Sequence, residues 1–301
     1  MTQLIRGTRN SDYGILQENI QMNNAGSEGF WFWTAVVFIF GSCVGSFLNV
    51  CIWRIPRDES LVSPSSHCPK CGHSLSWFEN IPLFSWPCLG GKCRKCRESI
   101  SFRYFFVELF TAMLFMLVWF KVVASYQPFA ILSVYFVMTM LVITTVFIDA
   151  EHFIIPNETT YPAAIAGLLF SLSFPEIWNT QSRIAALSHS AGGLVFGAGI
   201  FAVFAIAGKM IFKREALGWG DVKYLGAAGA CLGASACFFI VLFASLMGAV
   251  AGLLLIACGK GKLKSAIPFG PYLAVATYFW MVCGNKIVYW YISMLNSFAV
   301  K

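Results

Sequence analysis

The sequence predicts an all-α polytopic membrane protein with about eight transmembrane helices and one small cytoplasmic domain between the first two. Three observations support this. Of the 301 residues, 58% are hydrophobic and only 12% are charged, whereas a soluble domain carries about 25% charged residues. Several apolar runs reach the roughly 17–25 residues that a helix needs to cross a bilayer. The basic residues flank these runs on one side, which indicates membrane orientation and not nucleic-acid binding.

The elements follow in a simple order along the chain. Residues 1–30 form a polar extension without the apolar core of a signal peptide, and residues 31–53 form the first transmembrane helix. Residues 54–103 are polar, and residues 104–298 contain the remaining spans. The long apolar runs begin near Trp31, Tyr104, Phe129, Thr159, Ser188, Ala236 and Pro268. A shorter segment rich in glycine and alanine, from Val222 to Gly233, is the eighth.

The distribution of basic residues predicts the orientation of these helices. With residues 1–30 outside, the segments 54–103, 149–158, 209–223 and 259–267 all face the cytoplasm. They hold fifteen of the twenty-one lysines and arginines, and six remain elsewhere. This imbalance follows the positive-inside rule. A chain with seven spans would place the three lysines of 259–267 on the opposite side.

The polar segment 54–103 has the cysteine pattern of a zinc-binding domain. Two Cys-x-x-Cys pairs are separated by 21 residues, and they comprise Cys68, Cys71, Cys93 and Cys96. Four thiolates at this spacing can surround one zinc ion, and four such ligands leave no position for a catalytic water. We therefore expect a structural Zn²⁺. The alternative is a set of free or redox-active cysteines, and Cys88, His67 and His73 are substitute ligands.

Two aspartates are the candidate catalytic residues. Asp149 and Asp221 are the only aspartates beyond residue 60, and both adjoin long apolar runs. A carboxylate beside hydrocarbon is costly, which makes it a functional-site candidate. Two of them at one depth can share a proton and activate water. Taken singly, Asp221 could instead cap a helix, and Asp149 could pair with a basic residue. For Glu108, the simplest expectation is an ion pair with Arg103.

These motifs, taken in order, resemble the type IV prepilin peptidases. The similar segments are 41–56 in the first span, 68–96 in the cysteine domain, 103–108 at the start of the second span, 147–156 and 218–223 around the two aspartates, and 267–272 before the last span. The Gly218-Trp-Gly-Asp221 run matches the GxGD signature of the family. Where relatives commonly read Asp-x-Asp-His and Leu-Pro-Asp, this chain has Asp149-Ala-Glu-His and Ile-Pro-Asn157.

The resemblance implies a bifunctional enzyme of the bacterial inner membrane. It implies that Asp149 and Asp221 cleave the short basic leader of type IV prepilins or pseudopilins after a glycine, at the cytoplasmic membrane face. It also implies N-methylation of the new N-terminal residue by S-adenosylmethionine, with Glu79 and Gly91 as candidate contacts of the methyl donor. The expected partners are these substrates and the lipid bilayer, without nucleic acid, and a homo-oligomer stays open.

Two other functions remain open at this level. The first is a peptidase that has lost methyl transfer. The second is a polytopic proton or ion transporter with a zinc-stapled loop, in which the aspartates coordinate the transported ion. A transporter predicts carboxylates near the middle of the membrane, whereas the distribution of basic residues places them at its edge.

Overall fold

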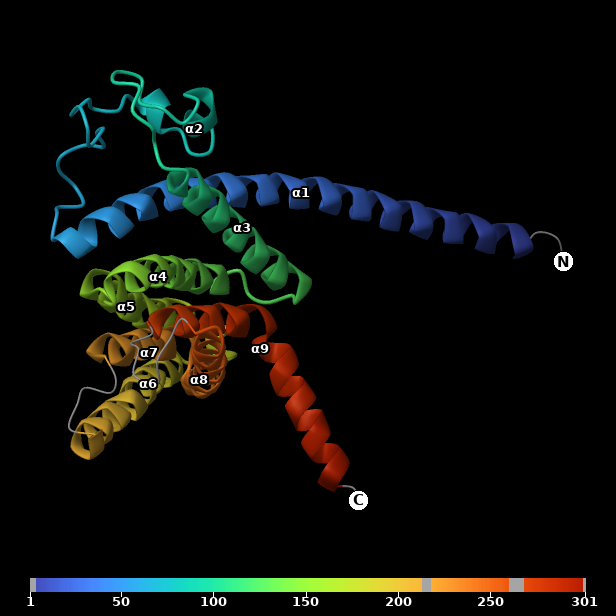
Figure 1. The fold of residues 1–301 in the computed structure, drawn as a ribbon. Helices are drawn as coiled ribbons and strands as arrows, with labels where there is room; N and C mark the ends of the chain where they lie inside the picture. The colour runs from blue at the N-terminus through green and yellow to red at the C-terminus, as the bar shows by residue number, and fades with distance from the viewer. Residues whose placement is uncertain (1–3, 213–217, 260–267, 300–301) are drawn as a thin grey trace.

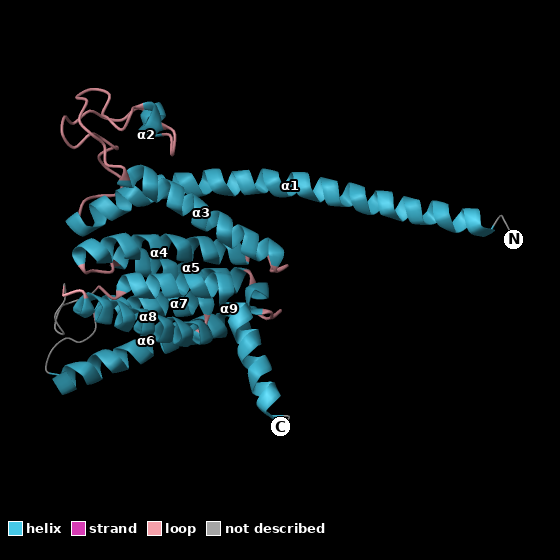
Figure 2. Ribbon diagram, turned by 45° about the vertical axis from the view of Figure 1, so that its right-hand side comes forward, coloured by secondary structure: helices cyan, strands magenta, loops and turns pink. Residues whose placement is uncertain are grey.

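The computed structural model describes residues 4–212, 218–259 and 268–299, and within them it is helical without strands (Figures 1 and 2). Helices suit this chain because a bilayer offers no water to the backbone, and a helix satisfies its own amide groups. The helices are α1 (Leu4–Arg54), α2 (Ser85–Cys88), α3 (Arg103–Ala124), α4 (Ile131–His152), α5 (Asn157–Ser173), α6 (Arg183–Phe212), α7 (Trp219–Leu232), α8 (Ala234–Ala257) and α9 (Gly270–Ala299).

Five helical segments of the described chain are long and apolar enough to cross a membrane. They are Gly29–Arg57, Arg103–Ala124, Ile131–His152, Arg183–Ala207 and Ala234–Ala257. Helices α5 and α7 have only 17 and 14 residues, so at about 1.5 Å per residue they are shorter than the roughly 30 Å hydrocarbon core. The chain is thus a multi-pass membrane protein, and the count of eight spans stays a prediction. The lysines predicted for the cytoplasmic segment 260–267 lie outside the described residues.

The first helix is longer than the predicted span 31–53, because it also includes most of the polar extension 1–30. In the structure α1 is continuous from Leu4 to Arg54. Its N-terminal part extends away from the helix bundle, at the end opposite the domain that contains α2 (Figures 1 and 2). Two glycines of α1 allow α3 to approach closely. A Cβ atom at Gly41 would lie 2.9 Å from the Ala112 backbone, and one at Gly45 would lie 2.7 Å from that of Glu108.

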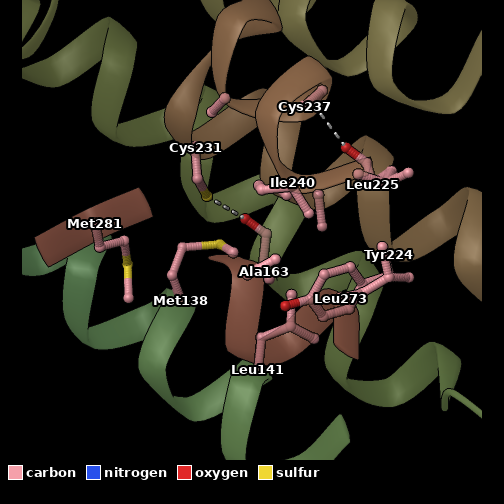
Figure 3. Close-up of a cluster of buried hydrophobic side chains, with 14 of the residues drawn as sticks. Met138, Leu141, Ala163, Tyr224, Leu225, Cys231, Cys237, Ile240, Leu273 and Met281 are labelled. Atoms are coloured by element: carbon pink, nitrogen blue, oxygen red, sulfur yellow. Dashed lines mark hydrogen bonds between the residues drawn. The ribbon is translucent and has the colours of Figure 1, made fainter. Parts of the chain in front are cut away.

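The main core joins α4, α5, α7, α8 and α9 (Figure 3). Fully buried side chains from three of these helices, among them Met138, Leu225 and Leu273, belong to it. Two thiol groups of this core donate hydrogen bonds to neighbouring helices (Figure 3). Cys231 donates to the Ala163 carbonyl at 3.4 Å, and Cys237 donates to the Leu225 carbonyl at 3.5 Å. These two cysteines are therefore part of the packing.

Helix α7 is short because other helices enclose it. Ten of its fourteen residues are buried. Glycine at 193 and 229 removes the side chains where α6 crosses α7, and a Cβ on either residue would collide with the carbonyl of the other. This packing fixes the last turn of α7 against α6, and Asp221 lies in the first turn of the same helix. The position of one predicted catalytic residue thus depends on how α7 packs within the bundle.

Candidate active site and metal site

The structure brings Asp149 and Asp221 to one cavity of about 550 Å³. Asp149 lies in the last turn of α4, and Asp221 lies in the first turn of α7. Both are largely buried, at 6% and 8% exposure. The cavity is lined by Asp149, Phe153, Ile154, Ile155, Gly218, Trp219, Gly220, Asp221, Pro268 and Phe269. Residues far apart in the sequence therefore surround one small space.

The local sequence places Asp221 at a helix N-terminus. Gly218 is the N-cap of α7, and its backbone forms a hydrogen bond with the Asp221 carboxyl. This contact is one half of a capping box, and the helix dipole also favours negative charge in the first turn. Gly220 serves a different purpose, because a Cβ atom there would lie 3.0 Å from the Cβ atom of Ile155. The GxGD run therefore lets α7 begin directly against the loop that follows α4.

Asp149 is held by the start of α9. The Gly270 amide donates a hydrogen bond to Asp149 Oδ2 at 2.9 Å, and a Cβ atom on Gly270 would lie 2.7 Å from the same oxygen. A helix N-terminus suits a carboxylate because its first amides have no partner within the helix. Sequence reasoning matched the run 267–272 only as the start of a span and missed this role. The Pro-Phe-Gly-Pro sequence before an apolar run could have indicated a helix start.

The arrangement can carry out acid–base chemistry on water. Because both carboxyls line one cavity, they can act as a coupled pair that holds one proton between them. In such a pair one carboxylate can accept a proton from water while the other donates to a carbonyl oxygen. Three apolar residues of the loop after α4, Phe153 to Ile155, contribute to the cavity wall.

The second site is the cluster of Cys68, Cys71, Cys93 and Cys96. The four Sγ atoms all lie within 4.8 Å of one another. Two of the separations are 3.8 Å, between Cys68 and Cys96, and 4.0 Å, between Cys71 and Cys93. A tetrahedron with Zn–S bonds of about 2.3 Å requires sulfur–sulfur distances of roughly 3.8 Å. The cluster can therefore hold a metal ion, and its geometry fits zinc.

The two cysteine pairs are local copies of one another. Each begins with an isolated β-bridge, between His67 and Ser74 or between Lys92 and Ser99. Each ends on a residue with positive φ directly after its second cysteine, Gly72 at 67° and Arg97 at 59°. The sequence carries this repeat as Cys-x-Lys-Cys-x-x-Ser, followed by Leu or Ile and then Ser. Repeating one turn gives each pair the same sulfur geometry.

The surroundings of the cluster favour bound thiolates. Backbone amides of Cys96 and Lys95 bond to the Cys93 sulfur and lower the pKa of that thiol to about 6. Amide hydrogen bonds stabilise the charged sulfur that a metal requires. Among the described residues, the substitute ligands do not join the cluster: Cys88 is an exposed free cysteine, His67 contacts the Ser65 carbonyl, and His73 contacts Glu79.

Glu79 and Gly91 lie in the same domain. The Glu79 side chain is 1% exposed, and its Oε2 accepts from the Ser76 amide at 2.9 Å and meets His73 Nε2 at 3.3 Å. The Ser76 amide is the main reason that the pKa of Glu79 is lowered. Its other oxygen, Oε1, is buried without a partner among the described residues. Gly91 has a φ of 65° and packs under Trp86, where a Cβ atom would lie 2.9 Å from the ring.

The expected ion pair between Glu108 and Arg103 is wrong. Arg103 pairs with Glu151 at 2.7 Å and lies over the Phe147 ring. Glu108 instead accepts from the Leu83 amide at 2.8 Å. Both residues lie near the start of α3, but the first faces α4 and the second faces the metal domain. The five-residue spacing of Arg103 and Glu108 on α3 could not predict that one contacts α4 and the other contacts the cysteine domain.

Comparison with known proteins gives consistent matches along most of the chain. Residues 39–122 match the bacterial peptidase A24 N-terminal domain, and residues 135–253 match the type IV leader peptidase family. The prepilin leader peptidase/N-methyltransferase of Aeromonas salmonicida is 35% identical over 290 residues, which cover 88% of this chain and 96% of that protein. No solved structure matches.

Two further relatives carry the same name. The protein of Myxococcus xanthus is 41% identical over 225 residues, which cover 74% of this chain and 64% of the relative. The protein of Pseudomonas aeruginosa is 33% identical over 278 residues, which cover 84% and 91% of the two chains. The similarity therefore extends over both the cysteine domain and the helical region with the two aspartates.

Proposed function

The chain belongs to the type IV leader peptidase family, and on that premise we propose that it cleaves type IV prepilins or pseudopilins and methylates the new N-terminus. The observation that carries this proposal is the shared cavity of Asp149 and Asp221. The substrate is the short basic leader together with the apolar helix that follows it. Cleavage occurs after the glycine that ends the leader.

Asp149 and Asp221 are the catalytic residues of this proposal. One of the two carboxylates takes a proton from the attacking water, and the other donates a proton to the scissile carbonyl oxygen. As it loses this proton, the water oxygen forms a bond with the carbonyl carbon and gives a tetrahedral diol. The C–N bond then breaks as the amine takes the proton from the first carboxyl, and a diol hydroxyl returns a proton to the second carboxyl. The Gly270 amide and the Gly218 backbone keep the two carboxyls facing the cavity.

The metal domain is assigned to methyl transfer. Cys68, Cys71, Cys93 and Cys96 hold a structural Zn²⁺, which fixes the two cysteine turns relative to each other. S-adenosylmethionine, when bound, supplies the methyl group. Glu79 is the candidate contact for a positively charged group because Oε1 is buried without a partner in the described domain. Gly91 is the second candidate contact of the donor, and its positive φ of 65° and its packing under Trp86 leave no room for a side chain there.

The proposed location is the bacterial inner membrane, with both sites on the cytoplasmic side. The predicted inner ends of the helices carry fifteen of the basic residues, which supports this orientation. Asp149, Asp221 and the metal domain all belong to segments at those ends. A substrate helix held in the bilayer would present its leader at this level.

The first prediction tests the function with purified protein, a prepilin and S-adenosylmethionine. We expect loss of the leader mass and gain of one methyl group by intact-mass spectrometry. Asp149→Asn and Asp221→Asn should each abolish cleavage, because an amide cannot exchange the proton that the reaction needs. Both variants should still methylate a pilin that has already been cleaved, and Asp58→Asn outside the cavity should behave as wild type.

Two outcomes would count against this proposal. Normal cleavage by either aspartate variant would remove that residue from the mechanism. Cleavage without any added methyl mass would leave a peptidase that has lost methyl transfer. A transporter would instead show no cleavage and would move ions across vesicles.

A further inference from the structure

Thr145 has a buried hydroxyl group one helical turn before Asp149. It lies four residues before Asp149 on α4, so both side chains project from the same face of the helix. Thr145 is fully buried, and Oγ1 has no hydrogen-bond partner among the described residues. A Cβ atom built on Gly270 would lie 3.0 Å from Thr145 Cγ2 and 2.7 Å from Asp149 Oδ2. Thr145 and Asp149 therefore flank the same point at the start of α9.

This free hydroxyl is an exception among the helical threonines whose side chains the structure describes. The others donate to a backbone carbonyl three or four residues earlier, and these are Thr34, Thr111, Thr139, Thr144, Thr159, Thr160 and Thr277. The adjacent Thr144 donates to the Met140 carbonyl at 2.9 Å. A buried hydroxyl without a partner is costly, so its presence beside Asp149 calls for a ligand.

The Asp149 carboxyl needs a second donor. Among the described residues its hydrogen-bond donor is the Gly270 amide, which bonds to Oδ2. A carboxylate has capacity for about four acceptor sites, and a group that must meet a scissile carbonyl in one orientation is better fixed by two contacts than by one. Thr145 is the buried donor on the same face of α4, one turn away.

We propose that Thr145 is a positioning residue for Asp149, with its hydroxyl binding one buried water that also donates to the Asp149 carboxyl. This inference rests on the proposed peptidase function of the cavity. The proposed ligand is a water molecule, because a hydroxyl and a carboxyl one helical turn apart can each bond to one. Thr145 acts on cleavage through Asp149 and has no part in methyl transfer.

The second prediction uses three variants in the cleavage assay. Thr145→Val keeps the shape of the side chain and removes only the hydroxyl, so kcat for cleavage should fall about tenfold to a hundredfold with KM nearly unchanged. Thr145→Ser keeps the hydroxyl and should restore most of kcat. Thr144→Val is the matched control, since this neighbour is equally buried and its hydroxyl is bonded to the backbone.

Methylation of a pilin that has already been cleaved reports on folding and should stay at the wild-type rate in all three variants. Wild-type cleavage by Thr145→Val would overturn the inference and leave the proposed function intact. Equal losses for Thr145→Val and Thr145→Ser would also overturn it, because they would indicate packing and not the hydroxyl. Absence of cleavage by the wild-type protein would instead contradict the proposed function.

Discussion

At the scale of single residues, the site depends as much on absent side chains as on the two carboxyls. Gly220 and Gly270 lie where a Cβ atom would meet Ile155 or Asp149 within about 3 Å. The aspartates could be found in the sequence because charge is rare in the apolar part of this chain. Gly270 and Thr145 could not, because their roles depend on which helix end meets α4.

The third prediction concerns Gly270. Gly270→Ala keeps the amide but places a methyl group 2.7 Å from Asp149 Oδ2, so the carboxyl or the start of α9 must move. Overpacking of this kind costs about 1–3 kcal/mol, and we expect cleavage to fall at least about tenfold while methyl transfer persists. The measurement is kcat/KM for prepilin cleavage.

The control for Gly270 is Gly199→Ala on α6, where a Cβ atom would meet nothing within 4 Å. Alanine is also the better helix former, so this variant should cleave at the wild-type rate. Equal activity of the two alanine variants would show that the close approach at Gly270 has no catalytic importance.

At the scale of elements, the cysteine domain has little regular structure of its own. Its only described helical segments between residues 58 and 102 are Trp77–Asn80 and Ser85–Cys88. A short segment with so small a core needs a metal or another cross-link to stay folded. The four cysteines could be predicted from their spacing. The structure was needed to show that both cysteine pairs have the same local backbone, with an isolated β-bridge and a residue of positive φ.

The fourth prediction follows from this dependence on metal. Cys96→Ser removes one thiolate from the cluster, so the domain should lose its metal and methyl transfer should fall at least about tenfold. Cleavage should fall less, because neither aspartate belongs to the domain. Metal content and both activities are measured together, with Cys88→Ser as the control because Cys88 lies in the same domain outside the cluster. Full methyl transfer by metal-free Cys96→Ser would contradict the assignment.

At the scale of the whole molecule, one ion pair of the described residues connects the start of α3, next to the cysteine domain, with the end of α4. Arg103, where the cysteine domain leads into α3, bonds to Glu151 at the end of α4. Glu151 is two residues beyond Asp149, so the contact lies between the domain assigned to methyl transfer and the cavity assigned to cleavage. Its side chains are 29% and 48% exposed, and such pairs contribute only about 0–1 kcal/mol to stability.

The fifth prediction is that this pair aligns the two sites more than it stabilises the fold. Arg103→Glu or Glu151→Arg alone should lower the fraction of cleaved pilin that becomes methylated about two- to fivefold, with little change in thermal stability. The double reversal restores the opposite charges and should recover much of that fraction. Intact-mass analysis of the products gives the fraction, and additive losses in the double variant would exclude a direct coupling.

The sequence by itself determined the membrane class, the four cysteines that can hold a metal ion and the two candidate catalytic residues. It could do so because apolar length, cysteine spacing and rare buried charge are local properties that need no neighbour to be recognised. Only the tertiary structure decided that α9 supplies the amide at Asp149, that Arg103 meets Glu151 instead of Glu108, and that the buried Thr145 hydroxyl has no partner among the described residues. These contacts join segments up to 121 residues apart, and helix packing alone selects which faces and ends come together.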